Sequence, residues 1–411
     1  MEQWRKNLYL SWISQTLALA GIGFILPFIP LYIQELGVEG PDTIKLWVGL
    51  TASIPGIAMA LMAPIWGIIS DRFGRKIMIV RALSSVVIIS VALSFAQSVV
   101  TVFILRMLQG LFTGTATASA TLVASGTPQK HLSRALGFLS SATFIGLCIG
   151  PLIGGFSAKL FGYRYSFLVG ASLVAIGLVF VIIFLKEPDQ FQSEEKTGSK
   201  KIQKKEQLKI RHLLKSPFVA MFIIMFLVRF ARSQPTAFIP LYLKELDPVI
   251  GTGGNDAAIT GLIMALFSAV GASAGFSFAR LGDRYDKYAL IIICSVLGSI
   301  VAFPTFISLN IWIFAIFYII SGYSFGCIYP LIQSFLSSNS ARTQRGILFG
   351  LQNLVGGLGF GLGPFTATWI SIKSDTRYIF LFYSISIACI AITLAFDHFT
   401  RKQIQNSKKI T

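Results

Sequence analysis

The chain has 411 residues, of which 54% are hydrophobic and 13% are charged, and its formal net charge is +18. Ordinary soluble domains carry about twice that share of charged residues, so the composition excludes a soluble globular protein. The sequence contains no nucleotide-binding loop, metal-ligand spacing or nucleophile motif. We therefore expect no enzymatic activity, no metal and no bound cofactor.

Apolar runs recur along the whole chain, and each is long enough to cross a hydrocarbon core of about 30 Å. They predict an all-α polytopic membrane protein with twelve transmembrane helices. The first run lacks a small-residue cleavage site, so we expect a retained helix rather than a signal peptide. In chain order, the predicted helices cover 8–33, 47–70, 77–96, 99–124, 135–159, 163–185, 217–244, 258–281, 287–307, 310–336, 345–372 and 377–397.

The loops on the two sides of the predicted membrane differ in charge. Lysine and arginine gather in the loops on the side of both termini, whereas the opposite loops hold few basic residues beside several acids. The positive-inside rule therefore places both termini in the cytoplasm. We interpret the net positive charge as topology rather than as a nucleic-acid-binding surface. A basic patch for anionic lipid head groups is compatible with that interpretation.

One long polar stretch divides the chain into two similar parts. It predicts a six-helix bundle over 1–185, a cytoplasmic linker over 186–216 and a second six-helix bundle with a short tail over 217–411. FIPLYIQELG is echoed by FIPLYLKELD, DRFGRK by DRYDKY, and GPLIGG by GPFTAT, in the same order and at a nearly constant offset. Parallel repeats of this kind occur in transporters, whose substrate site lies between the repeats near the middle of the membrane.

Three stretches carry a resemblance to a known family. GIISDRFGRK (67–76), RMLQG (106–110) and GLCIGPLIGG (146–155) resemble signature motifs of the major facilitator superfamily, and the third is typical of its drug/proton antiporters. The opening of the chain looks most like bacterial twelve-helix multidrug efflux members. This resemblance implies a monomer in a bacterial inner membrane. It also implies export of small amphipathic molecules by alternating access, driven by an ion gradient, which we expect to be protons.

The first of these motifs predicts a conformational switch. Gly67 lets a neighbouring helix come close, and Asp71 could then sit at the positive end of that helix. The resemblance implies that the neighbour is the eleventh helix and that the contact forms only when the transporter opens outward; alternatively, the motif is a basic turn that sets topology. The second copy has Asp286 where Gly74 stands in the first, which puts it in doubt. The predicted switch residues are Gly67, Asp71, Arg72, Gly74, Arg75, Lys76, Asp283 and Arg284.

The glycine-rich motif predicts tight helix packing. Its glycines recur every four residues on one helix face, and Pro151 removes a backbone hydrogen bond and bends the helix. The resemblance implies that this helix lies where the two halves meet and limits leak, although a plain packing face would produce part of the pattern. The predicted packing residues are Gly146, Gly150, Pro151, Gly154, Gly155, Gly363 and Pro364.

Arg106, Arg229 and Arg232 lie inside apolar runs, where an arginine is costly and indicates a functional site. The resemblance implies that Arg106 works with an acid in the first helix. The sequence departs from that pattern, because no predicted helix has an acid near its middle. Glu35 and Glu245, at equivalent outer ends, come closest, so the proton-carrying residue is not identified.

Arg229 and Arg232 are three residues apart and share one helix face. If they face a water-filled cavity, they suit a carboxylate or phosphate of an anionic substrate. Alternatively they bind backbone carbonyls or amides of nearby helices, or snorkel. The second possibility for function is therefore a carrier, exporting or importing, of an anionic metabolite or polycarboxylate siderophore. A non-transporting sensor would need a folded signalling domain, for which the linker and tail are too small.

Aromatic and amide side chains at membrane depth are weaker cavity candidates, because such residues also pack or hydrogen-bond between helices. They include an aromatic stripe on the first helix and three tyrosines on the tenth, among which is Tyr329. The predicted cavity and coupling residues are Arg106, Gln109, Arg229, Arg232, Gln234, Phe24, Phe28, Tyr32, Tyr323, Glu35 and Glu245.

Overall fold

The computed structural model describes residues 2–128, 131–187, 218–247, 255–281, 285–338 and 345–410. Every regular element in these ranges is a helix, which confirms the predicted all-α class. Each of the twelve predicted spans overlaps a helix of the structure. The 186–216 linker lies outside the described residues except for its first two positions.

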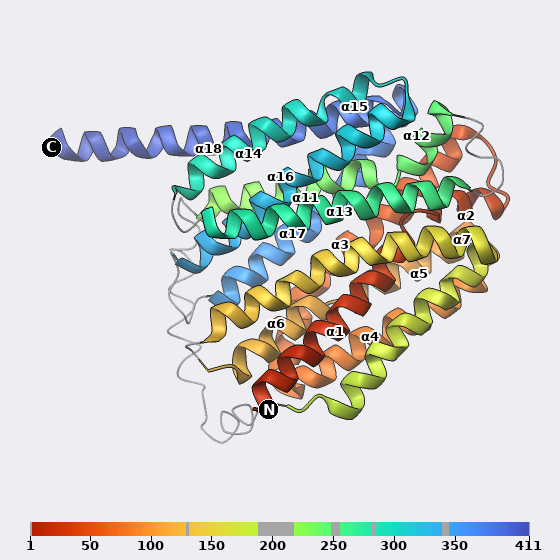
Figure 1. Cartoon of the computed structure of the whole chain (residues 1–411), viewed down its shortest axis with the longest axis horizontal. Helices are drawn as coiled ribbons and strands as arrows, with labels where there is room; N and C mark the ends of the chain where they lie inside the picture. Colours follow the sequence, from red (N-terminus) through yellow and green to blue (C-terminus); the bar gives the residue numbers. More distant parts are fainter. Residues whose placement is uncertain are drawn as a thin grey trace.

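The described residues of the first half form seven helices (Figure 1). Its fifth and sixth predicted spans are merged in α7, which turns at Gly162. The helices are α1 (Gln3–Phe24), α2 (Ile29–Glu35), α3 (Pro41–Phe73), α4 (Arg75–Ser94), α5 (Val99–Phe112), α6 (Thr115–Gly126) and α7 (Leu132–Phe184).

The second half follows the same plan. Its first span is again interrupted at a turn next to a proline and continues in a short helix. The sequence IPLYLKEL of α12 matches IPLYIQE of α2. The helices are α11 (Phe218–Thr236), α12 (Ile239–Leu246), α13 (Asn255–Leu281), α14 (Lys287–Ala302), α15 (Pro304–Ile307), α16 (Ile311–Ser338), α17 (Arg345–Lys373) and α18 (Tyr378–Ile410).

Length and hydropathy support a membrane protein. Within the described residues, nine helices are long and apolar enough to cross a membrane, and the bent pair α1 and α2 makes a tenth. α7 counts once among the nine although its 53 residues contain two predicted spans. The glycine-rich α17 is not among them. Length and hydropathy alone therefore give fewer than twelve spans, although each of the twelve predicted spans overlaps a helix.

The two halves lie side by side, with α2 and α12 at one end of the molecule and the N-terminus at the other (Figure 1). At the α2 and α12 end, a single hydrophobic cluster combines Phe28 and Tyr32 of the first half with Phe238 and Leu241 of the second. We call this the closed end. The opposite end, where α3 meets α4 and where the linker begins, we call the linker end.

Close backbone contacts at glycines join the halves. A Cβ atom placed on Gly56 of α3 would lie 2.6 Å from the backbone nitrogen of Gly361 in α17. Likewise, a Cβ on Gly155 of α7 would lie 2.3 Å from the carbonyl oxygen of Ala257 in α13. Only residues without a side chain allow such approach. We call these two helix pairs, α3 with α17 and α7 with α13, the seams.

The seams do not continue to the linker end. A Cβ placed on Gly67 of α3 or on Gly350 of α17 would have no other atom within 4 Å. Among the described atoms, the close contact that these two helices make at Gly56 is therefore absent at Gly67 and Gly350. Under the predicted topology, the linker end faces the cytoplasm, and this arrangement is inward-facing.

Lys45 offers a test of the contact between α3 and α17 at the closed end. Its ammonium donates to the carbonyl oxygen of Ser371, 2.9 Å away, and so joins α3 to α17. A charge-assisted hydrogen bond contributes about 1.5 kcal/mol, enough to change a two-state ratio roughly tenfold. Lys45→Met should therefore populate longer distances between spin labels at Glu39 and Ser374 in a background without the native cysteines.

The matched control is Lys244→Met, which removes an exposed lysine from the same end and should leave the distances as in the parent. An unchanged distance distribution in Lys45→Met would show that this hydrogen bond does not hold the seam.

Candidate functional site

Arg106 lies in α5, and only 4% of its surface is exposed. Its Nη1 donates to Gln109 Oε1 at 2.5 Å, and its Nε donates to the carbonyl oxygen of Thr51 in α3 at 3.3 Å. None of the three ion pairs within the described ranges includes it. The acid that the family resemblance implied in the first helix is therefore replaced by neutral partners, and a buried positive charge is held by an amide and a carbonyl.

Arg229 and Arg232 face aromatic rings of the second half. The guanidinium carbon of Arg229 lies 5.4 Å from the centre of the Tyr329 ring in α16, and that of Arg232 lies 5.8 Å from the Phe267 ring in α13. Both distances are within the range of cation–π attraction. Neither guanidinium has a carboxylate partner among the residues that the structure describes. The pair thus forms a positive, aromatic-lined site.

Tyr329 is the tyrosine of the tenth span whose ring faces Arg229. Tyr318 of the same span stacks on Phe267 beneath Arg232. Tyr323, which the sequence favoured, is 41% exposed and packs edge-on against Phe278 instead. Tyr329 Oη accepts a hydrogen bond from Gln333 Nε2 at 3.3 Å, so it is oriented from its own helix. Because the three tyrosines of the tenth span are irregularly spaced, the sequence alone could not predict which of them lies beside the arginines.

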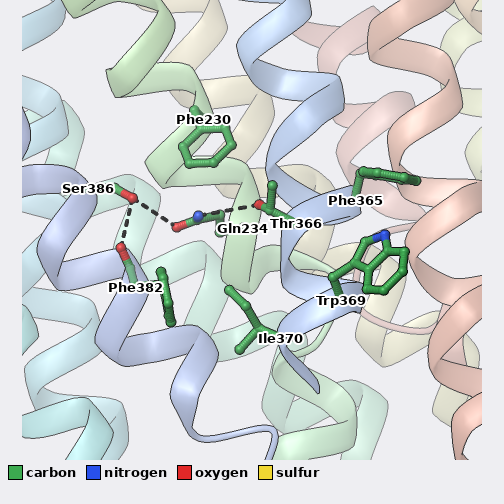
Figure 2. A pocket seen from close by; sticks show the side chains of 8 residues that line it. All are labelled: Phe230, Gln234, Phe365, Thr366, Trp369, Ile370, Phe382 and Ser386. Carbon is green, nitrogen blue, oxygen red and sulfur yellow. Dashed lines mark hydrogen bonds between the residues drawn. The ribbon is translucent and has the colours of Figure 1, made fainter. Parts of the chain in front are cut away.

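Gln234 does not join the arginines, which corrects its predicted place in the cavity. It follows Arg232 by two residues and so points to a different side of α11. Its amide accepts from Ser386 Oγ at 3.3 Å and donates to Thr366 Oγ1 at 3.5 Å, at the floor of a groove of about 380 Å³ (Figure 2). The rim residues Trp369 and Phe382 are 55% and 44% exposed, so the groove opens on the outside of the bundle.

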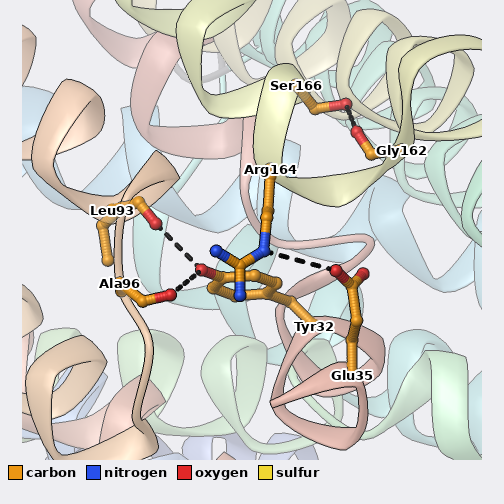
Figure 3. Close-up of polar contacts among 7 residues, drawn as sticks. All are labelled: Tyr32, Glu35, Leu93, Ala96, Gly162, Arg164 and Ser166. Carbon is orange, nitrogen blue, oxygen red and sulfur yellow. Dashed lines mark hydrogen bonds and ion pairs between the residues drawn. The ribbon is translucent and has the colours of Figure 1, made fainter.

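The aromatic stripe on the first span is core rather than cavity wall, which corrects a second expectation. Phe24, Phe28 and Tyr32 are fully buried. Phe28 and Tyr32 both pack edge-on against Phe167 of α7. Figure 3 shows that Tyr32 Oη also lies within hydrogen-bond distance of the carbonyl oxygens of Leu93 and Ala96, at 3.0 and 3.1 Å. These aromatic side chains, spaced four residues apart on the first span, therefore pack in the core.

Glu35 and Glu245 both lie at the closed end, remote from the arginines. Glu35 pairs with Arg164 across 3.5 Å, and both side chains are more than 40% exposed (Figure 3). Glu245 Oε1 accepts a hydrogen bond from Thr376 Oγ1 at 2.7 Å. Each acid therefore has a partner at the molecular surface.

Asp256 is a site residue that the sequence analysis overlooked. It is 4% exposed and is the only acid among the buried residues of the described part of the chain. Its Oδ1 accepts from the backbone N–H of Ala257 at 3.0 Å, and Ala257 is the residue that meets Gly155 at the seam. An acid directly before an apolar run is a first-turn helix signal, which could have placed it at the start of a span.

The predicted switch motif is held by its own half at the linker end. Gly74 has a φ of 93°, which favours glycine, and forms the turn between α3 and α4. The Glu187 carboxylate accepts from the backbone N–H groups of Arg75 and Lys76 at 2.9 and 2.8 Å, at the positive end of α4. The chain leaving α7 is thereby fastened to the turn.

The latch between this motif and the eleventh span stays a prediction. A Cβ atom placed on Gly67 would have no described atom within 4 Å in this arrangement. A latch that forms only in the outward-open state would be absent here. The side chains of Asp71 and Arg72, and the residues Asp283 and Arg284, lie outside the described part of the structure.

The helix that carries the glycine-rich motif lies between the halves, as the resemblance implied, because α7 forms a seam with α13. Three glycines of the motif nevertheless pack within their own half, which corrects the expectation that Gly146 and Gly150 face the other half. Cβ atoms on Gly146, Gly150 and Gly154 would lie 2.6, 2.4 and 2.0 Å from carbonyl oxygens of α1. Gly363, one residue before Pro364, makes the same kind of contact with the backbone of α11 in the second half. Only Gly155, and the Pro151 carbonyl that meets Gly261 of α13, reach across a seam.

Comparisons with known proteins agree with this architecture. A family model described as Major Facilitator Superfamily matches residues 11–249 and 248–410. Multidrug resistance protein MdtG of Escherichia fergusonii is 30% identical over 383 residues, covering 92% of this chain and 91% of that protein. MdtG of Proteus mirabilis is 30% identical over 380 residues, covering 92% of each.

Solved structures share the fold at low identity. The nucleoside transporter NupG superposes with a TM-score of 0.74 at 16% identity, over 95% of this chain and 99% of that one. A D-xylose-proton symporter superposes with a TM-score of 0.74 at 14% identity, over 96% and 97%.

Gly154 gives a direct test of the packing in the first half. In Gly154→Ala the new methyl group meets the Phe24 carbonyl oxygen, so α1 and α7 must move apart. We expect a loss of about 1–3 kcal/mol of stability, as for other overpacked interfaces, measured as a lower melting temperature in detergent. Gly137→Ala on the same helix has open space around it and should keep the melting temperature; equal melting of both variants would contradict the contact.

Proposed function

We propose that this chain, which belongs to the Major Facilitator Superfamily, is a secondary active transporter that exports small amphipathic organic molecules by alternating access. One observation carries the proposal: two seams join the similar halves at one end, whereas α3 and α17 lose their close contact at the other, and the arginine pair on α11 lies beside aromatic rings. Its relatives named as multidrug resistance proteins support an amphipathic cargo.

The seams supply the alternation. Close contacts at glycines hold α3 to α17 and α7 to α13, so the halves can part along these two helix pairs. With the linker end in the cytoplasm, the structure is the state that receives cargo from inside. Export then requires the seams to part at the closed end and the halves to meet at the linker end.

We assign proton coupling to Asp256. It is buried beside the α7 and α13 seam, so opening of that seam would expose its carboxylate to the outside. Among the described groups, the Ala257 N–H donates to the Asp256 carboxylate, and the Tyr163 hydroxyl lies near enough to feel its charge. Glu35 and Glu245 are weaker carriers, because both already have surface partners.

A second candidate is a carrier of an anionic metabolite. It is favoured by the arginine pair, since two guanidinium groups without a described carboxylate partner would attract a carboxylate or phosphate. The aromatic rings beside the same arginines suit an amphipathic cargo equally well. Direct competition between the two classes of cargo separates these possibilities.

Transport in proteoliposomes tests the cargo. Under an imposed pH gradient, we expect the wild type to move a cationic dye, and Arg229→Gln/Arg232→Gln to change dye transport less than tenfold. Arg5→Gln, which removes an exposed arginine outside the site, is the control. Uptake of a tricarboxylate that the double variant abolishes would replace drug export with anion transport.

Asp256→Asn tests the coupling. The amide keeps the size and can still accept the Ala257 N–H, but it cannot carry a proton. We expect facilitated dye movement to persist while its dependence on the pH gradient is lost. Glu35→Gln should retain the dependence. A gradient-driven Asp256→Asn would remove Asp256 from the coupling role.

A further inference from the structure

The fourth predicted span is broken in the middle, at Thr113 and Gly114 between α5 and α6. Gly114 has a φ of 134°, a conformation that favours glycine, and Thr113 is extended. No proline lies at this break, so the break was not predicted from the sequence analysis. Discontinuous helices in transporters mark places where backbone groups are free to bind or to move.

The break leaves three carbonyl groups at the end of α5 without helical partners, and three side chains of the two preceding spans approach them. Trp66 Nε1 donates to the Leu111 carbonyl oxygen at 2.7 Å. Ser85 Oγ lies 3.3 Å from the Phe112 carbonyl oxygen, although it is closer, at 2.8 Å, to Ala82 of its own helix. Arg81 Nη2 donates to the Thr113 carbonyl oxygen at 3.4 Å. We call Trp66, Arg81 and Ser85 the clamp.

Arg81 lies inside a span, where an arginine is costly. Its contacts with Trp66 and with the Thr113 carbonyl oxygen offset that cost. It lies six residues, about 9 Å, along α4 from Arg75. Its guanidinium carbon is 3.3 Å from the centre of the Trp66 ring, a close cation–π contact. No acid pairs with it in the described ranges, and its Nε and Nη1 are buried without hydrogen-bond partners.

The break lies between the Arg106 and Gln109 pair and a contact that joins the two halves. Arg106 and Gln109 lie on α5, one to two turns before it. Thr117 lies on α6, just after it, and its hydroxyl accepts from Asn353 of the other half at 3.4 Å. α5 is fixed to α3, since a Cβ on Gly110 would lie 2.4 Å from the Pro55 carbonyl oxygen. The angle at the break therefore sets where α6 meets the second half.

We propose that the clamp holds the angle of this break, and that Arg81 is a positioning residue for the Arg106 and Gln109 pair and for the Thr117 contact. The transport consequence rests on the proposed function, whereas the geometry does not. Losing Arg81 frees the Thr113 carbonyl and removes the cation from the Trp66 ring. The break then samples several angles, and α5 and α6 lose their fixed relation.

Distances between spin labels at Val100 on α5 and Ser125 on α6 test the geometry in the full-length protein, without native cysteines and without any transport assay. We expect one narrow distribution in the parent and a broad or shifted one in Arg81→Met. Arg81→Lys keeps the charge but lacks the guanidinium fork, and should be intermediate. Arg134→Met, which removes an exposed arginine from the same end, should match the parent.

Dye transport tests the consequence. We expect Arg81→Met to raise KM by at least about fivefold, as the loss of a charge-assisted hydrogen bond would, with a smaller change in maximal rate. Trp66→Phe keeps a ring but removes the N–H donor, and should show a milder form of the same change if Arg81→Met does not fold. A parent-like distance distribution in both variants would overturn the clamp, whatever the transport result. A parent that moves no dye would instead refute the proposed function.

Discussion

Close approach of helix backbones is the constraint on which this structure depends. Lipid is as apolar as the side chains of a membrane protein, so helices associate by van der Waals contact rather than by escape from water. Glycines supply that contact here in two ways. Gly146, Gly150 and Gly154 bind α7 to α1 within a half, and Gly56 with Gly361 joins α3 to α17 between halves. The first set builds a rigid body, and the second closes a seam that must part again.

Buried positive charge is the second constraint. Arg106 is answered by an amide and a carbonyl, Arg81 by a carbonyl and a tryptophan ring, and the α11 pair by aromatic rings. Carbonyls and π faces hold a cation by partial charges, without a carboxylate that would fix it in one state. With such partners, the arginine pair can still bind a polar group of a cargo. A carboxylate already paired with the arginines would occupy that position.

Much of this could be predicted from the sequence, because length, hydropathy and repeats act over whole spans. All twelve predicted spans overlap helices, and the repeated FIPLY segments form equivalent α2 and α12. Side-chain direction could not be predicted, since one residue of helix register moves a side chain by about 100°. Gln234 and Tyr32 were therefore misplaced. Asp256 was missed because the sequence pattern of an acid at a helix start does not show whether that end of the helix is exposed to solvent or buried.

The repeat also shows where the two halves ceased to be equivalent. The counterpart of the broken α5 and α6 is α16, a continuous helix of 28 residues that contains Pro330. The break in the first half occurs without proline and is stabilised by side chains, whereas the proline in the second half does not break its helix. A break held by side chains can change its angle when those contacts change. The first half thus contains the adjustable joint, and the second half carries the arginine pair on α11. A cargo bound between them would touch a fixed charge on one side and a movable helix on the other, and that difference gives its binding a means to favour one arrangement of the halves.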